Sequence, residues 1–363
     1  MDKFKFYSVG LVCLIVTEFL VLVFTCFYLD PPVGDTTRVS GYSENDFGWN
    51  APQKVFEKPA TPLQDGYDHY SDVFVVGDSF SFGGLLQMMN YPWQTYLSTS
   101  SGLSVSTFSH YTTKTNPPSY DPSFIPNIVN SETFKKTPPK VFVLEVVERQ
   151  LNILPKIAGD CKIHNKIQKA NIDIKALPLI HPTLDVDRNK QRPAFNERFP
   201  YAVKYLATFV QLKAGENQAY VFDLVTPKLF TSKSSDKLLV YEGDVKKKNW
   251  DDKLIADIKC RLINFQNLVQ ENGKTLFVVM VAPDKLTVYS PYLSDSKFAK
   301  ISPISRLTEE PLLHLPRFDL PLQLALRQNV EDLYLPNDTH WASKGQQVAA
   351  MTLQKYISEF SGD

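Results

Sequence analysis

The sequence predicts an α/β fold, an α/β/α sandwich around a central, mostly parallel sheet, preceded by one N-terminal transmembrane helix. Two observations favour the sandwich: several short apolar runs resemble buried strands, and amphipathic helical patterns separate them. A third, a long apolar run close to Met1, favours the transmembrane helix. The overall composition, 43% apolar and 21% charged, is that of an ordinary globular protein and excludes a disordered chain.

The N-terminal apolar run extends from Tyr7 to Leu29 and, as a helix, measures roughly 35 Å, enough to span a bilayer. A cleavable signal peptide is the competing interpretation, but the run is long for one and no small-x-small site follows it. Lys3 and Lys5 place the N-terminus in the cytoplasm. We therefore expect residues 1–30 to form a cytoplasmic tip and a single-pass anchor in the inner (cytoplasmic) membrane. The rest of the chain then lies in the periplasm or extracytoplasmic space.

The exported domain, residues 71–363, contains the predicted sheet. Four mostly β-branched or aromatic runs predict strands, and three of them are near-continuous, as in parallel strands covered on both faces: Val73–Gly77, Leu103–Ser109, Lys140–Val147 and Thr275–Pro283. After Asp251, apolar residues recur at helical spacing until Gly273, and a final amphipathic helix is expected near the C-terminus. Strands that alternate with helices predict a doubly wound sheet.

Two segments depart from this alternation. Residues 31–70 are rich in Pro, Gly, Asp and Thr, which predicts a linker and irregular surface. Between about 155 and 245, Lys, Pro and Asn are frequent and strand-like runs are short. We expect this second segment to be an insertion beside the sheet.

Charge and cysteine usage restrict the possible partners. Lys plus Arg equals Asp plus Glu at 39 each, so no net charge favours nucleic acid. The basic run Val245–Trp250 is short and is expected to be a solvated loop. Outside the apolar run only Cys161 and Cys260 remain, and they either form one disulfide or stay as two buried thiols.

A serine follows the first predicted strand, in the sequence Gly77-Asp78-Ser79-Phe80. Ligands of open parallel sheets bind beyond the carboxyl ends of the strands, and a serine there exposes its hydroxyl at a helix N-terminus. Turns and helix caps use the same residues, so this motif alone is weak evidence for a nucleophile, which also needs a base. The Gly-Lys-Ser/Thr signature of a phosphate loop is absent.

The run Tyr334–Gln346 supplies a candidate base, because Asp338 and His340 are two residues apart in a turn before the last helix. An imidazole base needs one nitrogen facing the serine and the other held by an acceptor. The alternative is that Asp338 only caps the helix and His340 lies on the surface. Together with Ser79 the pair predicts a triad of nucleophile (Ser79), base then acid (His340) and orienting carboxylate (Asp338). The sequence contains no recognisable metal or nucleotide motif, and no cofactor is expected.

Serine first and Asp/His last is the order of the SGNH or GDSL hydrolase superfamily, which this chain resembles. The motifs "GDSF" and "DTHW" look more like those of the alginate O-acetyltransferase branch (AlgX/AlgJ type). Two further segments also resemble segments of that branch, "VFVLEVVER" and "VAPDKLTVY". In the alginate proteins the Asp/His segment precedes the serine segment, so here the motif order is circularly rearranged. The anchor-first layout is also similar to that of the D-alanyl-transfer protein of teichoic acid assembly.

This resemblance implies a membrane-anchored serine O-acetyltransferase that modifies an extracytoplasmic polysaccharide through an acetyl-serine intermediate. The implied partners are the polysaccharide acceptor and a multispanning membrane-bound O-acyltransferase as acyl donor, because acetyl-CoA is cytoplasmic. Two alternatives stay open: a carbohydrate O-acetyl esterase of the same fold, and a catalytically inactive polysaccharide-assembly or binding protein.

The resemblance also implies roles for residues outside the triad. Arg149 matches the arginine that contacts ligand in the family, the alternative being an ion pair with Glu145 or Glu148. Asp78 is expected to shape the turn at Ser79. Lys285 either lines the cleft or, as the safer expectation, is solvated.

Overall fold

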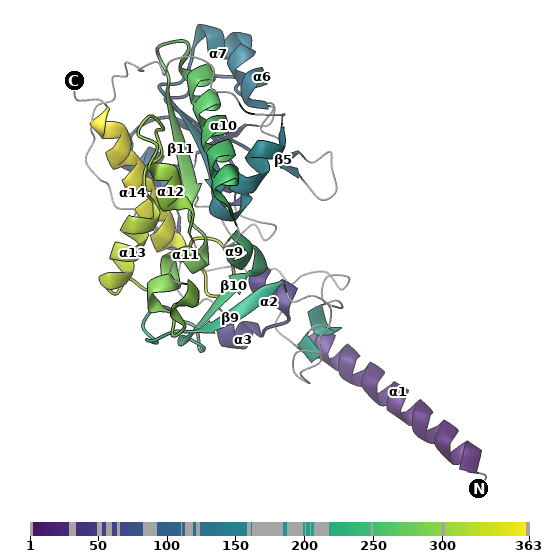
Figure 1. Cartoon of the computed structure of the whole chain (residues 1–363). Helices are drawn as coiled ribbons and strands as arrows, with labels where there is room; N and C mark the ends of the chain where they lie inside the picture. The colour runs from purple at the N-terminus through teal and green to yellow at the C-terminus, as the bar shows by residue number, and fades with distance from the viewer. Residues whose placement is uncertain are drawn as a thin grey trace.

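The structure is a computed structural model of the chain. It describes residues 3–28, 34–48, 53–55, 60–63, 66–82, 93–109, 111–112, 119–120, 124–157, 161, 184–186, 199, 201–203, 205–206, 218–247, 250–298 and 302–360. Helix α1 (Lys3–Tyr28) extends away from the rest of the described chain (Figure 1). The other elements surround a central sheet.

The central sheet has five strands, all parallel, in the spatial order β11-β7-β3-β4-β2. Four of these strands coincide with the apolar runs of the sequence: β3 (Val73–Gly77), β4 (Val105–Ser109), β7 (Val141–Val147) and β11 (Leu276–Ala282). The structure thus confirms the α/β fold with a central parallel sheet. The fifth strand, β2 (Thr61–Leu63), lies at the edge and is not indicated by the sequence pattern. Its Pro62 is tolerated there because an edge strand needs no hydrogen bonds on its outer side.

Helices cover both faces of the sheet, as a strand buried on both sides requires (Figure 1). In β3, Val73 and Val75 face one helical layer, whereas Phe74 and Val76 face the other. The first layer contains α5 (Trp93–Ser101), α13 (Asp319–Arg327) and α14 (Ser343–Glu359). The second contains α6 (Phe124–Asn130), α7 (Glu132–Lys136), α10 (Asp252–Gln270) and α12 (Ile304–Thr308). Each fully buried large apolar side chain contributes about 1.5–3 kcal/mol to folding.

Helix α10 begins and ends where the sequence indicates. The Asp251 side chain accepts a hydrogen bond from the Leu254 backbone N–H, 2.8 Å away, and so caps the first turn. Beyond its last residue, Gly273 takes a positive φ of 66°, which lets the chain turn into β11. The cap and the glycine therefore fix the length of the helix that feeds the central sheet.

The described part of segment 31–70 is more regular than the predicted linker. Besides β2 it contains two short helices, α2 (Asp35–Ser40) and α3 (Glu44–Phe47). Their polar residues pack against the loop that follows Leu335, through contacts distant in sequence that composition alone does not indicate.

The remaining elements are short. Among the described residues, three two-stranded antiparallel pairs lie outside the central sheet: β1 (Gln53–Val55) with β8 (Leu184–Val186), β5 (Tyr111–Thr112) with β6 (Ser119–Tyr120), and β9 (Ala219–Asp223) with β10 (Lys237–Tyr241). The other short helical turns in the described part of the chain are α4 (Ser79–Phe82), η1 (Glu148–Ile157), α9 (Glu242–Lys246), α11 (Lys285–Tyr289), η3 (Ser290–Tyr292) and η4 (Ser296–Phe298).

Segment 155–245 contributes the β9–β10 hairpin, which lies beside the central sheet and not within it. Cys161 of the same segment forms a disulfide with Cys260 of α10, their Cα atoms being 6.1 Å apart. Of the two states that the sequence left open for these cysteines, the structure therefore has the bridge. Most of residues 162–217 lie outside the described residues.

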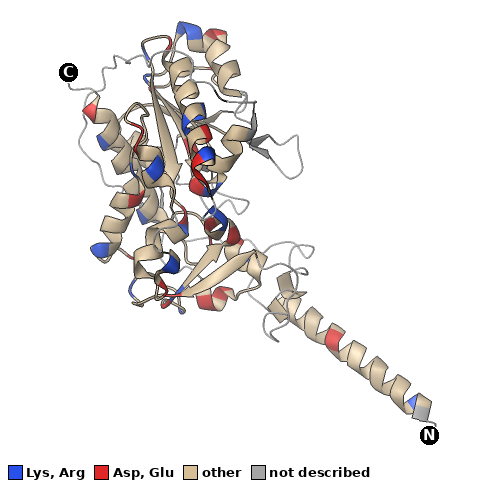
Figure 2. Cartoon of the chain, in the orientation of Figure 1, with Lys and Arg blue, Asp and Glu red and all other residues tan. Residues whose placement is uncertain are grey.

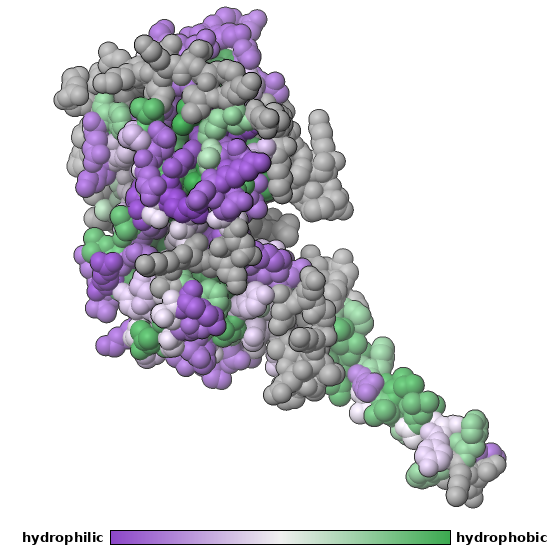
Figure 3. Space-filling model, viewed as in Figure 1, coloured by the Kyte–Doolittle hydropathy of each residue, from purple (hydrophilic) through white to green (hydrophobic). Residues whose placement is uncertain are grey.

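Helix α1 is apolar over nearly its whole length (Figures 2 and 3). Among the described residues, Phe4–Phe27 is the one helical stretch long and apolar enough to cross a membrane. A membrane anchor and an N-terminal signal sequence both have this length and composition.

Candidate active site

Ser79 lies at the carboxyl end of β3, where the strand passes into the short helix α4. Asp78 shapes this turn: its Oδ1 accepts from the Phe80 N–H at 2.9 Å and its Oδ2 from the Val147 N–H at 2.6 Å. At Gly77, a Cβ atom would lie only 2.2 Å from the Ser81 hydroxyl oxygen, so only glycine fits. The structure confirms the expected role of Asp78 in the turn.

Glu145 supports the same turn from the neighbouring strand β7. Its Oε2 accepts from the Asp78 N–H at 2.9 Å and from the Ser81 hydroxyl at 2.8 Å. Burial, together with the negative charge of Asp78, raises the pKa of Glu145 well above its usual value. The turn that presents Ser79 is thus fixed by two fully buried carboxyl groups.

Ser79, His340 and Asp338 form a continuous hydrogen-bonded relay. The Ser79 Oγ lies 2.8 Å from His340 Nε2, and His340 Nδ1 lies 2.5 Å from Asp338 Oδ1. Because an ionised carboxylate only accepts hydrogen bonds, Nδ1 carries the proton and Nε2 accepts from the serine hydroxyl. This is the geometry expected of a triad, formed by residues 261 positions apart in the chain.

The electrostatics of the pair suit a histidine that takes up a proton. Burial opposes ionisation of Asp338, but His340 and the hydrogen bonds from neighbouring N–H groups outweigh it and hold the pKa of Asp338 below its usual value. Burial likewise disfavours the imidazolium, yet Asp338 raises the pKa of His340 above its usual value. The Asp338 carboxylate therefore stabilises the charged form of His340.

Lys285 holds the loop that carries Asp338 and His340. Its Nζ donates to the backbone carbonyl oxygens of Leu335 at 2.8 Å, Pro336 at 2.9 Å and Asp338 at 3.2 Å. The side chain is fully buried, and burial lowers the pKa of Lys285 to about 8. The expectation of a solvated lysine was wrong, because the loop's carbonyl groups come from a distant part of the chain and replace water around the ammonium group.

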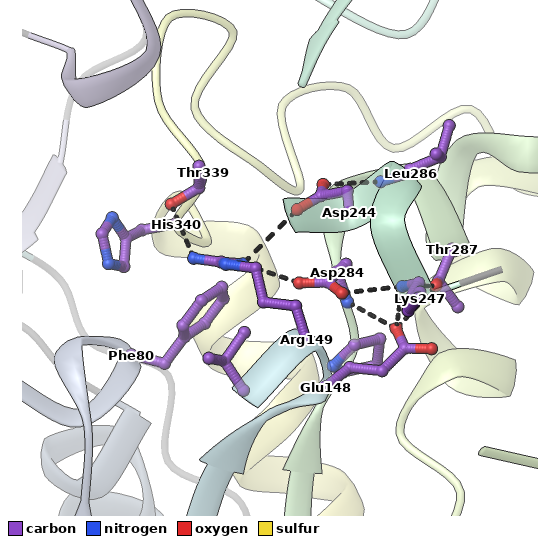
Figure 4. A network of polar contacts seen from close by, with 12 residues as sticks. Phe80, Glu148, Arg149, Asp244, Lys247, Asp284, Leu286, Thr287, Thr339 and His340 are labelled. Carbon is purple, nitrogen blue, oxygen red and sulfur yellow. Dashed lines mark hydrogen bonds and ion pairs between the residues drawn. The ribbon is translucent and has the colours of Figure 1, made fainter. Parts of the chain in front are cut away.

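Arg149 follows β7 and points toward the same loop (Figure 4). Its Nη1 donates to Asp284 Oδ1 at 2.6 Å and lies 3.6 Å from Asp244 Oδ1, while Nη2 lies 3.5 Å from the Thr339 hydroxyl. Burial opposes the charge, but these two carboxylates outweigh it and raise the pKa of Arg149, so the guanidinium stays charged. Glu145 and Glu148, the ion-pair partners considered from the sequence, are not its partners among the described contacts.

Lys247 extends the buried charge cluster beyond Asp284, on the side away from Arg149 (Figure 4). Its Nζ lies 2.7 Å from Glu148 Oε2 and 2.7 Å from Asp284 Oδ2, and all three side chains are fully buried. The sequence placed Lys247 in a solvated loop, and the structure corrects this. The charged run alone does not indicate that Glu148, after β7, and Asp284, after β11, pair with Lys247 in the folded chain.

Asp35, Asp338 and His340 place three potential metal-ligand atoms within 4.8 Å of one another. Hydrogen bonds account for this proximity. Asp338 Oδ1 accepts from His340 Nδ1, and both oxygens of Asp35 accept from Thr339. We therefore describe the group as part of the hydrogen-bonded relay.

Four charged residues of the site were not singled out from the sequence: Asp35, Asp244, Lys247 and Asp284. The first three lie in segments whose composition predicts a linker, an insertion or a solvated loop, and Asp284 directly follows the predicted strand Thr275–Pro283. The position of an acidic residue a few positions beyond the apolar run, in Gly34-Asp35-Thr36, was the one available signal for Asp35, and N-caps and turns use the same residues.

A parallel α/β/α fold, with a Ser-His-Asp relay at the carboxyl end of one strand, defines a serine hydrolase or acyltransferase class. Residues 234–361 match the family model of the SGNH hydrolase-like domain of the acetyltransferase AlgX. This match confirms the resemblance to the SGNH superfamily and its AlgX branch. It includes Asp338 and His340, and it does not extend to Ser79 or Arg149. No curated protein and no solved structure matches significantly.

Proposed function

We propose that the protein is a membrane-anchored serine O-acetyltransferase that acetylates hydroxyl groups of an extracytoplasmic polysaccharide. The observation that carries this proposal is the relay from Ser79 Oγ through His340 to Asp338. The AlgX-type match over residues 234–361 favours acetyl transfer to a glycan over other reactions of the same triad.

The relay supports a double displacement. His340 Nε2 takes the proton from the Ser79 hydroxyl while Oγ attacks the acetyl carbonyl of the donor. His340 then returns this proton to the leaving group, and an acetyl-serine remains. In the second half, His340 takes a proton from a sugar hydroxyl, whose oxygen attacks the acetyl carbonyl carbon. The bond between this carbon and Ser79 Oγ then breaks, and His340 returns the proton to Oγ.

Two groups are positioned to assist this reaction. The Ser79 backbone N–H has no hydrogen-bond partner among the described residues, so it is available to the oxyanion that develops on the acetyl carbonyl. Arg149 holds a permanent positive charge next to Thr339 and contacts the Phe80 ring at 6.0 Å from the centroid. We propose that Arg149 contacts the substrate from this side of the site.

The proposed location rests on two features. The Cys161–Cys260 disulfide is typical of an oxidising, extracytoplasmic compartment. Helix α1 is long and apolar enough to anchor the chain in the inner membrane. Because acetyl-CoA is cytoplasmic and the proposed site is extracytoplasmic, the acetyl group must cross the membrane. A multispanning membrane-bound O-acyltransferase is the proposed partner for this step.

The first experiment tests the nucleophile. With p-nitrophenyl acetate as donor, the wild-type chain in detergent should form an acetyl ester on Ser79, detected by peptide mass spectrometry. Ser79→Ala should abolish this ester and reduce turnover by roughly 10⁴-fold or more, because the covalent step has no other acceptor. Ser98→Ala is the matched control, since the Ser98 hydroxyl on α5 donates to the nearby Leu103 carbonyl, away from the relay.

The same assay separates the alternatives. A transferase should produce acetylated glycan when a neutral or acidic acceptor glycan is added, and acetate release should fall accordingly. Release of acetate alone, unaffected by every acceptor, would establish the esterase. Equal turnover by wild type and Ser79→Ala would exclude the serine mechanism and leave a binding or assembly protein.

A further inference from the structure

The described segment from Gly34 to Glu44, which begins six residues after the end of α1, is packed against the loop of the proposed triad. The Asp35 backbone N–H donates to Asp338 Oδ2 at 2.9 Å. The Asp35 side chain accepts from Thr339 twice, through the backbone N–H at 2.9 Å and the hydroxyl at 2.9 Å. Its Oδ2 also lies 3.8 Å from His340 Nδ1, so a second carboxylate stands beside the imidazole.

Further contacts fix the register between this segment and the loop. Glu44 accepts from the Gly34 N–H at 3.0 Å and from the Asn337 side-chain amide at 2.7 Å. The Thr37 N–H donates to the Asn337 carbonyl at 3.2 Å. A Cβ at Gly34 would lie 1.9 Å from that same carbonyl oxygen, so the two backbones approach as closely as glycine permits. Asp35 is therefore held at His340 by the packing on both sides of it.

We propose that Asp35 is a positioning residue of the acyl-transfer site, which fixes the Asp338–His340 loop and adds a second negative charge beside the imidazole. This inference rests on the proposed function. Asp338 orients the imidazole from its Nδ1 side, and Asp35 restrains Asp338 through its own backbone N–H. The stretch after the apolar helix is thus part of the active site and not only a tether.

The charges that face His340 come from several elements. Asp338 lies on the same loop, Asp35 on α2, Arg149 on η1 and Asp78 at the end of β3. Burial and Arg149 lower the pKa of His340, whereas Asp338 and Asp35 raise it. Burial and the negative charge of Asp338 raise the pKa of Asp35 itself, although His340 and the hydrogen bonds from Thr36 and Thr339 oppose this rise. In the pH range where Asp35 is ionised, removal of its charge should lower the pKa of His340, because the imidazolium loses one of its two stabilising carboxylates.

The sign of the kinetic effect follows from the role of a general base, which must be neutral to accept a proton. As the pH rises through the pKa of His340, kcat/KM rises, and this forms the acidic limb of the profile. With the pKa of His340 lowered, Asp35→Asn should move this limb to lower pH by roughly half a pH unit or more. The plateau should fall by roughly two- to threefold, because a less basic imidazole is a weaker general base.

The experiment measures hydrolysis of p-nitrophenyl acetate against pH by the full chain in detergent. Asp35→Asn preserves the shape of the side chain and removes its charge, and Asp35→Glu keeps the charge and should keep the acidic limb near that of wild type. Asp46→Asn on the neighbouring α3 is the matched control, because this half-exposed carboxylate pairs with Lys233 away from the site. Asp35→Ser replaces the asparagine variant if the latter does not fold.

The outcomes distinguish this inference from the proposed function. A shifted limb in Asp35→Asn, with Asp35→Glu and Asp46→Asn close to wild type, supports the role of Asp35. If Ser79→Ala is inactive but the Asp35→Asn limb does not move, Asp35 is only structural and the inference is wrong. If Ser79→Ala is as active as wild type, the proposed function itself fails, and with it the inference.

Discussion

Asp244 is a buried carboxylate whose negative charge is incompletely compensated. One oxygen lies 3.6 Å from Arg149 Nη1, longer than a hydrogen bond, and the other accepts from the Leu286 N–H at 3.3 Å. Burial and the adjacent Asp284 raise the pKa of Asp244 to about 7. Between its usual pKa and this value, the folded protein holds a proton at Asp244 that the unfolded chain has released.

Unfolding in this range releases that proton, and the release becomes more favourable as the pH rises, so stability should fall from about pH 4 to pH 7. One pKa unit corresponds to about 1.4 kcal/mol, so the loss from this group is at most about 4 kcal/mol. Thermal unfolding measured at several pH values should show that Asp244→Asn makes folding stability depend less on pH between about 4 and 7. The half-exposed Asp46→Asn serves as control, and an equal flattening in both variants would contradict the assignment to Asp244.

The residues that could be predicted from the sequence are those whose chemistry is local. Asp338 and His340 are two positions apart, and Ser79 follows a strand that its own apolar run indicates. Asp35 contacts Asp338 across 303 positions, and Arg149 contacts Asp284 across 135. Such pairs form only when the sheet brings distant segments together, so spacing in the sequence does not indicate them.

At the scale of elements, the same distinction holds. The four strands with apolar runs could be predicted nearly to the residue, and so could α10 with its capping Asp251. Edge strand β2 could not, because three residues, one of them proline, do not form a recognisable run. Helix α9 could not be predicted, because a short charged segment is expected to be a solvated loop. Its neighbour Lys247 is instead buried between Glu148, which follows β7, and Asp284, which follows β11.

Two adjacent lysines test this buried cluster. Lys247→Met leaves Glu148 and Asp284 without their shared cation, and loss of one partner of a buried pair costs about 3–5 kcal/mol of folding stability. Lys246→Met is the control, since 67% of the Lys246 side chain is exposed and its pair with Glu242 is worth less than about 1 kcal/mol. We expect a clear fall in Tm for the first variant only. Similar Tm values for both variants would mean that the cluster does not contribute to stability.

At the scale of the whole molecule, the main question concerns α1. We expect the mature protein to keep this helix, because its apolar length suits an anchor and no small-x-small cleavage site follows. The chain should remain in the membrane fraction after carbonate extraction, and N-terminal sequencing should begin before Phe4. A variant that lacks residues 1–30 should be released. A mature N-terminus beyond Leu29 would identify α1 as a signal sequence.

The short connection between α1 and the loop of the proposed triad limits where the proposed reaction can take place. The chain advances six residues from Tyr28, the end of α1, to Gly34, which contacts Asn337. Since a residue spans at most about 3.6 Å, Gly34 lies within about 22 Å of the end of the helix. If α1 stays in the bilayer, the serine is confined to a thin layer next to the lipid headgroups. Under the proposed function, only those parts of a glycan that pass through this layer could be acetylated, so polymer would be modified as it leaves the membrane and fully exported strands would not.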